Sequence, residues 1–276
     1  MALALVAVAG VGCQKKEGVD PTPPTPGEPA AAFEPRVIYT LEFHPEPGRE
    51  ISDEDKETTL INLRERLSID LEKVRVTREG EDRVLVSIGD EVSTEELEPA
   101  LTMSAKLSFQ MAHPTHREYV GVTDPAEVIV PGGTLVPYRE VDEVTGERQY
   151  LLVGDKVEIR GDHVKRAQAV KDPGRWSILL NLDKEGGERL YELSKAHNIR
   201  GAGPSGLPFA IILDGEILSA PVFTEPIAGG IAQISGSFDE TEARRLASAM
   251  QTPLAIPLRI LFKSGAAGAA DEPGEE

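Results

Sequence analysis

Residues 207–250 read LPFAIILDGEILSAPVFTEPIAGGIAQISGSFDETEARRLASAM, and this stretch predicts a large part of the fold. Its first apolar run, Phe209–Leu213, ends at Asp214-Gly215, a pair that tolerates the positive φ of a hairpin turn. We therefore expect a buried strand, a tight turn and a return strand over Glu216–Leu218. Pro221 ends the hairpin, because proline cannot donate to a central ladder.

The second half of the stretch predicts a strand followed by a capped helix. Gly229-Gly230 marks a turn, and Ile231–Ser235 alternates as a half-buried strand does. Asp239 is a good N-cap, and Glu242 three residues later completes a capping box. The helix that follows places its apolar residues at helical spacing on one face: Ala243, Leu246, Ala247 and Met250.

This stretch resembles the end of the first large periplasmic domain of SecD, the accessory subunit of the bacterial secretion translocase. The match is long and ungapped, although Gln251–Leu254 stands where the family usually has Gly-Ala-Leu-Pro. The resemblance implies a two-part extracytoplasmic module, with a base and a head that holds an emerging polypeptide. The matching residues are Ala210, Asp214, Gly215, Ser219, Ala220, Pro221, Pro226, Ile227, Gly229, Gly230, Gln233, Ile234, Ser235, Gly236, Phe238, Glu242, Ala243, Leu246 and Ala247.

The chain before this stretch predicts two helices among short strands. Residues 36–43, RVIYTLEF, alternate as a strand, and the leucines of residues 60–67 share a helix face. Two alternating strands, a second helix and a last strand over Leu107–Met111 follow. The second helix either starts late, with Pro99 near its first position, or is kinked at Pro99. The order is βαββαβ, the split βαβ arrangement of ferredoxin-like domains.

The predicted fold class is therefore α+β. A ferredoxin-like βαββαβ base subdomain covers residues 36–114, with a return strand over 254–262, and an inserted α+β head subdomain covers residues 115–253. Within the head, Tyr150–Val153, Val157–Ile159 and Trp176–Leu182 are expected strands. Asp183 is expected to cap the helix that carries Leu190 and Leu193.

The N-terminus has the features of an export signal. Residues 2–12, ALALVAVAGVG, are small or apolar and end at Cys13, the single cysteine. As a helix they span only ~17 Å, too short for a ~30 Å hydrocarbon core, so residues 1–13 resemble a signal peptide with a lipobox. That resemblance implies acyl chains on Cys13; an ordinary cleaved signal or a buried free cysteine are the alternatives. A proline-rich linker is expected over 14–35 and a disordered acidic tail over 263–276.

Composition excludes several classes of function. The net charge of −18, from 29 basic and 47 acidic residues, argues against nucleic acid as a partner and against electrostatic binding to anionic lipid. No stretch after residue 12 approaches ~20 apolar residues, so we expect contact with a membrane only through the lipid anchor, without the family's proton-driven membrane part. His113 and His116 suggest at most a weak metal hypothesis, and we predict no metal, no cofactor and no enzymatic activity.

The functional prediction is a SecD-like binding module on the periplasmic side of the bacterial cell envelope. Its partners would be exported or unfolded polypeptides, with translocase subunits as further candidates. The predicted polypeptide contacts are Phe223, Ile227, Gly229 and Gly230, around an apolar turn beside strand edges that an extended peptide can join. The alternative is a structural or envelope-assembly lipoprotein that kept the fold without a role in secretion.

Overall fold

A computed structural model describes residues 34–265, apart from 69–70, 91–92, 120, 123–124, 126–127, 143–144 and 201–205. Cys13, the predicted signal peptide, nearly all of the predicted linker and most of the acidic tail lie outside the described residues. Among the described helices, none combines the length and the apolarity that crossing a bilayer requires.

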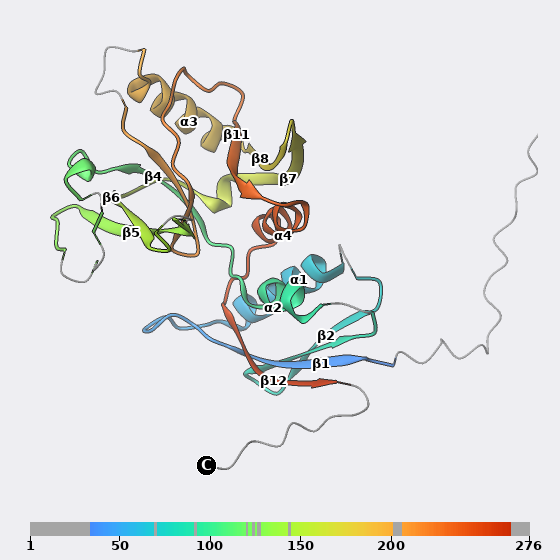
Figure 1. The fold of residues 1–276 in the computed structure, drawn as a ribbon. Coiled ribbons are helices and arrows are strands. Elements are labelled where there is room, and N and C mark those ends of the chain that lie inside the picture. Colours follow the sequence, from blue (N-terminus) through green and yellow to red (C-terminus); the bar gives the residue numbers. More distant parts are fainter. Residues whose placement is uncertain are drawn as a thin grey trace, which may run out of the picture. The chain divides into compact units, whose positions relative to one another are not determined.

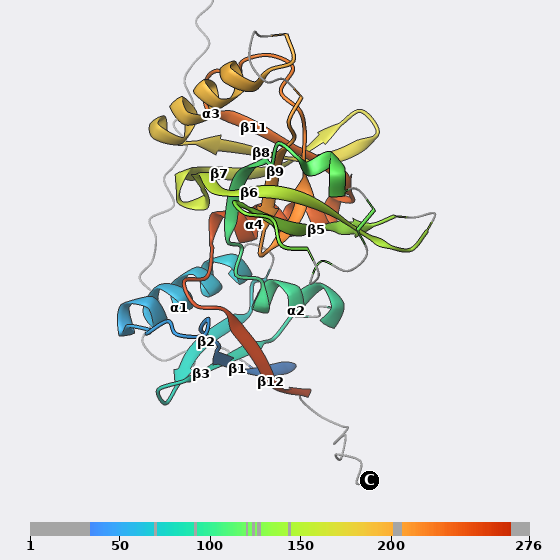
Figure 2. The same cartoon turned by 90° about the vertical axis from the view of Figure 1, so that its left-hand side faces the viewer.

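The first and the last described strands lie in one four-stranded antiparallel sheet, which with its helices we call the four-stranded layer. The sheet order is β12-β1-β3-β2. Figures 1 and 2 both show α1 and α2 over the same face of this sheet. The elements are β1 (Val37–Phe43), α1 (Asp53–Ser68), β2 (Val74–Glu79), β3 (Arg83–Ile88), α2 (Thr94–Thr102) and β12 (Leu258–Gly265).

The core of the four-stranded layer follows from the predicted patterns. Alternate residues of β1 and β3 are buried, and they meet the leucines of α1. Ser52 and Asp55 bond each other at the start of α1. Pro99 lies inside α2 rather than at its first position, and Ser93 makes no side-chain capping bond to it.

The inserted region (Leu107–Gln251) holds a closed barrel and a second sheet. The barrel has the strand order β10-β5-β6-β4-β9, and a three-stranded sheet has the order β11-β8-β7. Its elements are β4 (Leu107–Ala112), η1 (His116–Tyr119), β5 (Gly133–Val141), β6 (Arg148–Arg160), η3 (Gly161–His163), β7 (Val164–Asp172), β8 (Arg175–Leu182), α3 (Lys184–His197), β9 (Phe209–Leu213), β10 (Glu216–Ser219), β11 (Ile231–Phe238) and α4 (Glu240–Gln251).

The structure corrects the predicted sixth element of the βαββαβ order. Strand β4, expected in the base, pairs with β9 and β6 of the barrel instead. The sixth position is filled by β12, which pairs with β1 and begins at Leu258 rather than Leu254. The alternation of β4 predicted a half-buried strand correctly, but alternation does not say which sheet a strand joins. The two strands expected over 150–159 are also one strand, β6.

The stretch that decided the prediction folds largely as expected. Every residue of β9 is buried, and both Asp214 (φ 49°) and Gly215 (φ 84°) take the positive φ of the predicted turn. Asp239 accepts a hydrogen bond from the Glu242 N–H (2.7 Å) and caps α4. The carboxylate of Glu242 pairs with Arg139 (3.2 Å). Of the two hydrogen bonds of the predicted capping box, the structure therefore describes only the one that Asp239 accepts.

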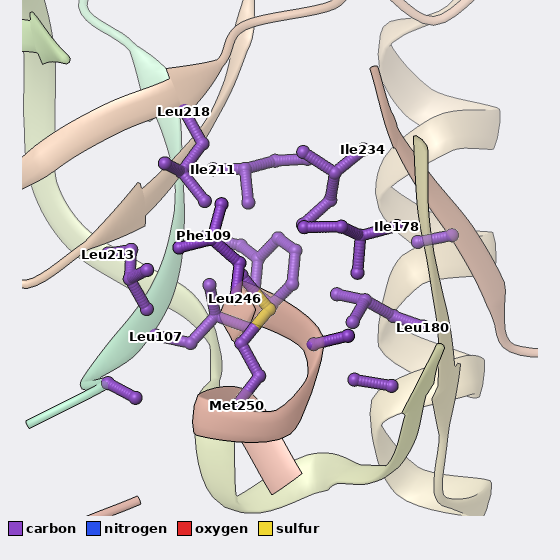
Figure 3. Close-up of a cluster of buried hydrophobic side chains, with 14 of the residues drawn as sticks. Leu107, Phe109, Ile178, Leu180, Ile211, Leu213, Leu218, Ile234, Leu246 and Met250 are labelled. Carbon is purple, nitrogen blue, oxygen red and sulfur yellow. The ribbon is translucent and has the colours of Figure 1, made fainter. Parts of the chain in front are cut away.

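One apolar cluster joins the barrel to the second sheet. Figure 3 shows side chains of β4, β8, β9, β11 and α4 meeting in it, among them Phe109 and Met250. Three phenylalanine rings lie in series within it: Phe109 stacks on Phe209 with centroids 5.7 Å apart, and Phe223 lies tilted against Phe209 with centroids 4.8 Å apart. A smaller cluster that includes Ile212 and Ile217 lies among the barrel strands.

Candidate functional site

The first candidate site is a groove between helix α3 and the turn Ala228-Gly229-Gly230, with a volume of about 490 Å³. We call it the α3 groove. Its lining is mostly apolar or glycine backbone, and charged residues of the first turns of α3 form its rim. The lining residues are Leu182, Asp183, Lys184, Gly187, Glu188, Tyr191, Glu192, Ala228, Gly229 and Gly230.

Close backbone contact between α3 and the turn sets the bottom of the α3 groove. A Cβ atom on Gly187 would lie 3.0 Å from the Cα of Gly230, and a Cβ on Gly230 would lie 3.2 Å from the Cα of Gly187. Gly230 also has φ 67°, a conformation that side chains disfavour. Its carbonyl accepts a hydrogen bond from the Leu182 N–H (2.8 Å), which ties the turn to the end of β8.

Helix α3 is fixed at both ends of the groove. Asp183 caps it by accepting from the Gly186 N–H (2.8 Å), as predicted, and also contacts the His163 ring at 3.1 Å. The Gly186 N–H, followed by the His163 side chain, holds the pKa of Asp183 below its usual value. Further along, the fully buried Ser194 hydroxyl accepts from the Ile227 N–H (2.8 Å) and donates to the Tyr191 carbonyl.

The rim of the α3 groove is acidic and aromatic. Tyr191 is 37% exposed, and the Nζ of Lys195 lies 5.6 Å from its ring centroid. Lys184 and Glu188 form a long ion pair of 3.9 Å, and Glu192 is exposed beside them. Such a site can hold an apolar or aromatic side chain and favours positive charge next to it.

Only part of the predicted contact set reaches this groove. Gly229 and Gly230 line it. Ile227 does not line it; this residue is half-buried against the core, and its N–H donates to the Ser194 hydroxyl. Phe223 does not line the groove: it is 4% exposed, and its ring lies against Phe209 in the core. Sequence reasoning missed Tyr191. The glycines at 186 and 187 were a usable signal, since two glycines weaken a helix unless close packing requires them.

A buried arginine, Arg66, links the four-stranded layer to the inserted region. Arg66 is 3% exposed, and its guanidinium donates to the carbonyls of Ala100 (3.1 Å) and Met103 (2.6 Å) at the end of α2. It also donates to the carbonyl of Thr252 (2.5 Å) at the end of α4. Both helix ends carry partial negative charge, which suits a buried cation. Burial lowers the pKa of Arg66 to about 10, although the charge of Asp214 raises it, so the group stays protonated at pH 7.

Asp214 holds the segment that leads from the four-stranded layer into the barrel, and we call this segment and the contacts of Arg66 the junction. Its carboxylate accepts from the N–H groups of Ala105 (2.9 Å) and Lys106 (2.8 Å), and its own N–H donates to the Lys106 carbonyl (3.0 Å). Ala105 has φ 59°, so the segment that enters the barrel is strained and needs these bonds. The sequence predicted Asp214 only as a turn residue.

The two histidines of the metal hypothesis, His113 and His116, make local hydrogen bonds. The Nδ1 of His113 lies 2.9 Å from the Thr115 hydroxyl, and the Nδ1 of His116 lies 3.0 Å from the His113 carbonyl. Within the described part of the chain, no three His, Cys, Asp or Glu side chains are grouped as a metal site would need.

Comparison with known proteins assigns the inserted region. The family described as "SecDF, P1 head subdomain" matches residues 135–255. Residues 135–255 are a SecD-family P1 head. The α3 groove lies wholly within this P1 head, whereas Arg66 lies outside it and reaches its last helix.

Relatives extend the match beyond the P1 head. The protein translocase subunit SecD of Acetobacter pasteurianus is 31% identical over 190 residues, which cover 66% of this chain and 33% of that protein. SecD of Syntrophobacter fumaroxidans is 31% identical over 188 residues, with the same coverage of both chains. The chain therefore spans about a third of the length of these relatives.

Solved structures agree on the fold. A structure described as "Structure and function of a membrane component SecDF that enhances protein export" matches with a TM-score of 0.58 and 20% identity, over 82% of this chain and 98% of that chain. The SecDF crystal structure in a super-membrane-facing form matches with a TM-score of 0.59 and 20% identity, over 82% of this chain and 30% of that chain. At this identity the likeness shows the α+β fold and no more.

Proposed function

We propose that this chain is a non-catalytic, extracytoplasmic SecD-like module that contacts exported polypeptides or the secretion translocase. The observation that carries the proposal is the P1 head, with an open apolar groove beside the Gly229-Gly230 turn. The head and the surrounding base, with its return strand β12, would act as the two parts of the module. No described group in the groove forms a nucleophile–base pair, so the groove is suited to binding.

The α3 groove fits a single large side chain of an unfolded segment. Its volume of about 490 Å³ falls in the ordinary range for small ligand sites. An apolar lining accepts many side chains without requiring matched hydrogen bonds, which suits a protein that must bind many different sequences. The acidic rim, together with the net charge of −18, would favour segments that carry Lys or Arg near an apolar residue.

The proposal is tested by titrating the purified chain with a fluorescent, permanently unfolded polypeptide. Ala228→Trp places a large side chain in the α3 groove from an exposed position, so binding should weaken by about tenfold or more. The matched control is Ile61→Trp, at a 55% exposed site on α1, which should bind like the parent chain. Equal affinity of the two variants, or no binding by the parent, would contradict the proposal.

We also propose that Cys13 carries the acyl chains that hold the module at the periplasmic side of the envelope. The support is the small and apolar run that ends at this single cysteine. Metabolic labelling with a fatty-acid analogue should mark the parent chain and leave Cys13→Ser unlabelled. Equal labelling of both would reject the anchor and would leave the binding proposal untouched.

A further inference from the structure

The sheet of the four-stranded layer has one face that no described element covers. Helices α1 and α2 lie over the opposite face (Figure 1). On that face Tyr39, Val86 and their neighbours form the core. The residues that alternate with this core face away from the helices. Phe262 of β12 is the most exposed apolar side chain among them, at 67%. We call this surface the open sheet face.

Strand register arranges the open sheet face in rows across all four strands. One row is Phe262–Thr40–Leu85–Thr77, in the strand order β12-β1-β3-β2. Side chains of directly paired residues point to the same face, so each row is a line of neighbours. Phe262 and Leu85 give this row an apolar character, and Ile38 lies in the next row.

A parallel row alternates in charge. Its members are Arg259, Glu42, Arg83 and Glu79, so the signs run plus, minus, plus, minus from β12 to β2. Arg259 and Glu42 form an ion pair, and their side chains remain 58% and 25% exposed. Arg83 and Glu79 are exposed as well.

We propose that the open sheet face binds a second copy of this chain, face to face, about a two-fold axis parallel to the strands between β1 and β3. That rotation reverses the strand order, so β12 lies over β2 of the second copy and β1 lies over β3. The charged row then meets its own reverse, and Arg259 faces Glu79 while Glu42 faces Arg83, so all four contacts join opposite charges. Phe262 at the same time covers Thr77 of the second copy. A two-fold interface must be self-complementary in this way.

The size of the face predicts a weak dimer. Four strands ~4.8 Å apart and about seven residues long give the sheet a flat area of roughly 450 Å² per copy, without the additional surface of the side chains. Two such faces reach the lower end of the range for specific interfaces, roughly 1,000 Å² in total. The dimer should therefore form at micromolar concentration and dissociate on dilution. Aligned packing of two sheets about 10 Å apart leaves room for the side chains of both faces.

Sedimentation velocity of the full chain carrying Cys13→Ser tests the proposal. The parent should shift from monomer to dimer with rising concentration. Phe262→Asp should weaken the dimer by about tenfold or more, because it puts a charge at an apolar contact. Ile61→Asp is the matched control, an exposed apolar residue on the helix side of the layer, and should leave the dimer intact. A parent that is monomeric at all concentrations, or a dimer that Phe262→Asp leaves unchanged, would overturn the proposal.

A charge swap distinguishes contacts between copies from pairing within one sheet. Arg259→Glu alone, or Glu79→Arg alone, creates two like-charge contacts in the proposed dimer and should weaken it by roughly tenfold. The double variant restores opposite charges at all four contacts and should restore dimerisation. If the charged row acts only within its own sheet, the double variant places like charges side by side on β12 and β1 and on β3 and β2. Its dimerisation would then be no stronger than that of the single variants. Absence of rescue in a folded double variant would overturn the two-fold arrangement.

Discussion

The four-stranded layer and the inserted region each have their own apolar core, but the segments between them are held by polar bonds. The core of the layer and the main core of the inserted region share no residue. Between them, Arg66 donates to helix-end carbonyls, Asp214 accepts from backbone N–H groups, and the Leu254 N–H donates to the Ser104 carbonyl (2.9 Å). Two bodies joined by hydrogen bonds can separate locally without exposing either core.

This difference indicates that the apolar cores stabilise each region, whereas the hydrogen bonds between the regions can rearrange. Apolar burial scales with the area removed from water, so each core unfolds as a unit. Hydrogen bonds at the junction can exchange one carbonyl partner for another or for water at a small net cost. The following predictions compare the two kinds of contact, beginning with the core of the inserted region.

Phe223→Ala should have the largest effect, destabilising the chain by about 3–5 kcal/mol, because it leaves a cavity beside Phe209. Phe262→Ala, at a 67% exposed position, should change the free energy of unfolding by less than about 0.5 kcal/mol. Urea unfolding at a low protein concentration measures both. Similar losses for the two variants would show that Phe223 is not part of a packed core.

Arg66→Met should cost about 3 kcal/mol, because it removes a buried charged donor from carbonyls of two helices at once. Arg64→Met on the same helix is the control; Arg64 donates one described bond, to the Val76 carbonyl, and its loss should cost about 1 kcal/mol. The same unfolding assay compares them. A smaller loss for Arg66→Met than for Arg64→Met would mean that the junction contributes little stability.

Asp214→Asn keeps one carbonyl oxygen and leaves one of two backbone N–H groups without its partner, so it should cost about 1–2 kcal/mol. Amide hydrogen exchange at Ala105 and Lys106 should become faster. Asp82→Asn serves as the control, because the Asp82 side chain is 75% exposed. Unchanged exchange at both amides would contradict the assigned role of Asp214.

The smallest predicted effect is a pH dependence at Asp183. Its pKa in the folded chain is lowered by the Gly186 N–H and the His163 side chain. The stabilisation is therefore present above the unfolded pKa, near 4, and is lost as the pH falls through the lower folded value. Asp183→Asn should flatten the fall of the urea midpoint below about pH 4. An identical pH profile for parent and variant would show that the cap does not titrate with folding.

The sequence predicted the elements that depend on neighbours along the chain. Strand β9, the Asp214-Gly215 turn and the Asp239 cap were expected and are confirmed, because alternation, turn chemistry and capping are local signals. The cap of α3 by Asp183 belongs to the same class.

Features that depend on distant partners were not predicted. Strand β4 was placed in the wrong sheet, since its pattern fits either sheet equally well. Phe223 was predicted as a polypeptide contact, but its ring packs in the core against Phe209, which comes from β9. Arg66 was seen only as part of a helix, because its acceptors lie 34 to 186 residues away.

Photocrosslinking in living cells asks whether the P1 head of this chain contacts exported polypeptides or the translocase, as we propose. The photoreactive residue replaces Tyr191 in the α3 groove, and the control probe replaces Ile61 on α1; both positions are exposed. We expect adducts with many exported proteins, or with a translocase subunit, from position 191 and not from position 61. Adducts with a single envelope protein, equal adducts from both positions, or none from position 191 would contradict it.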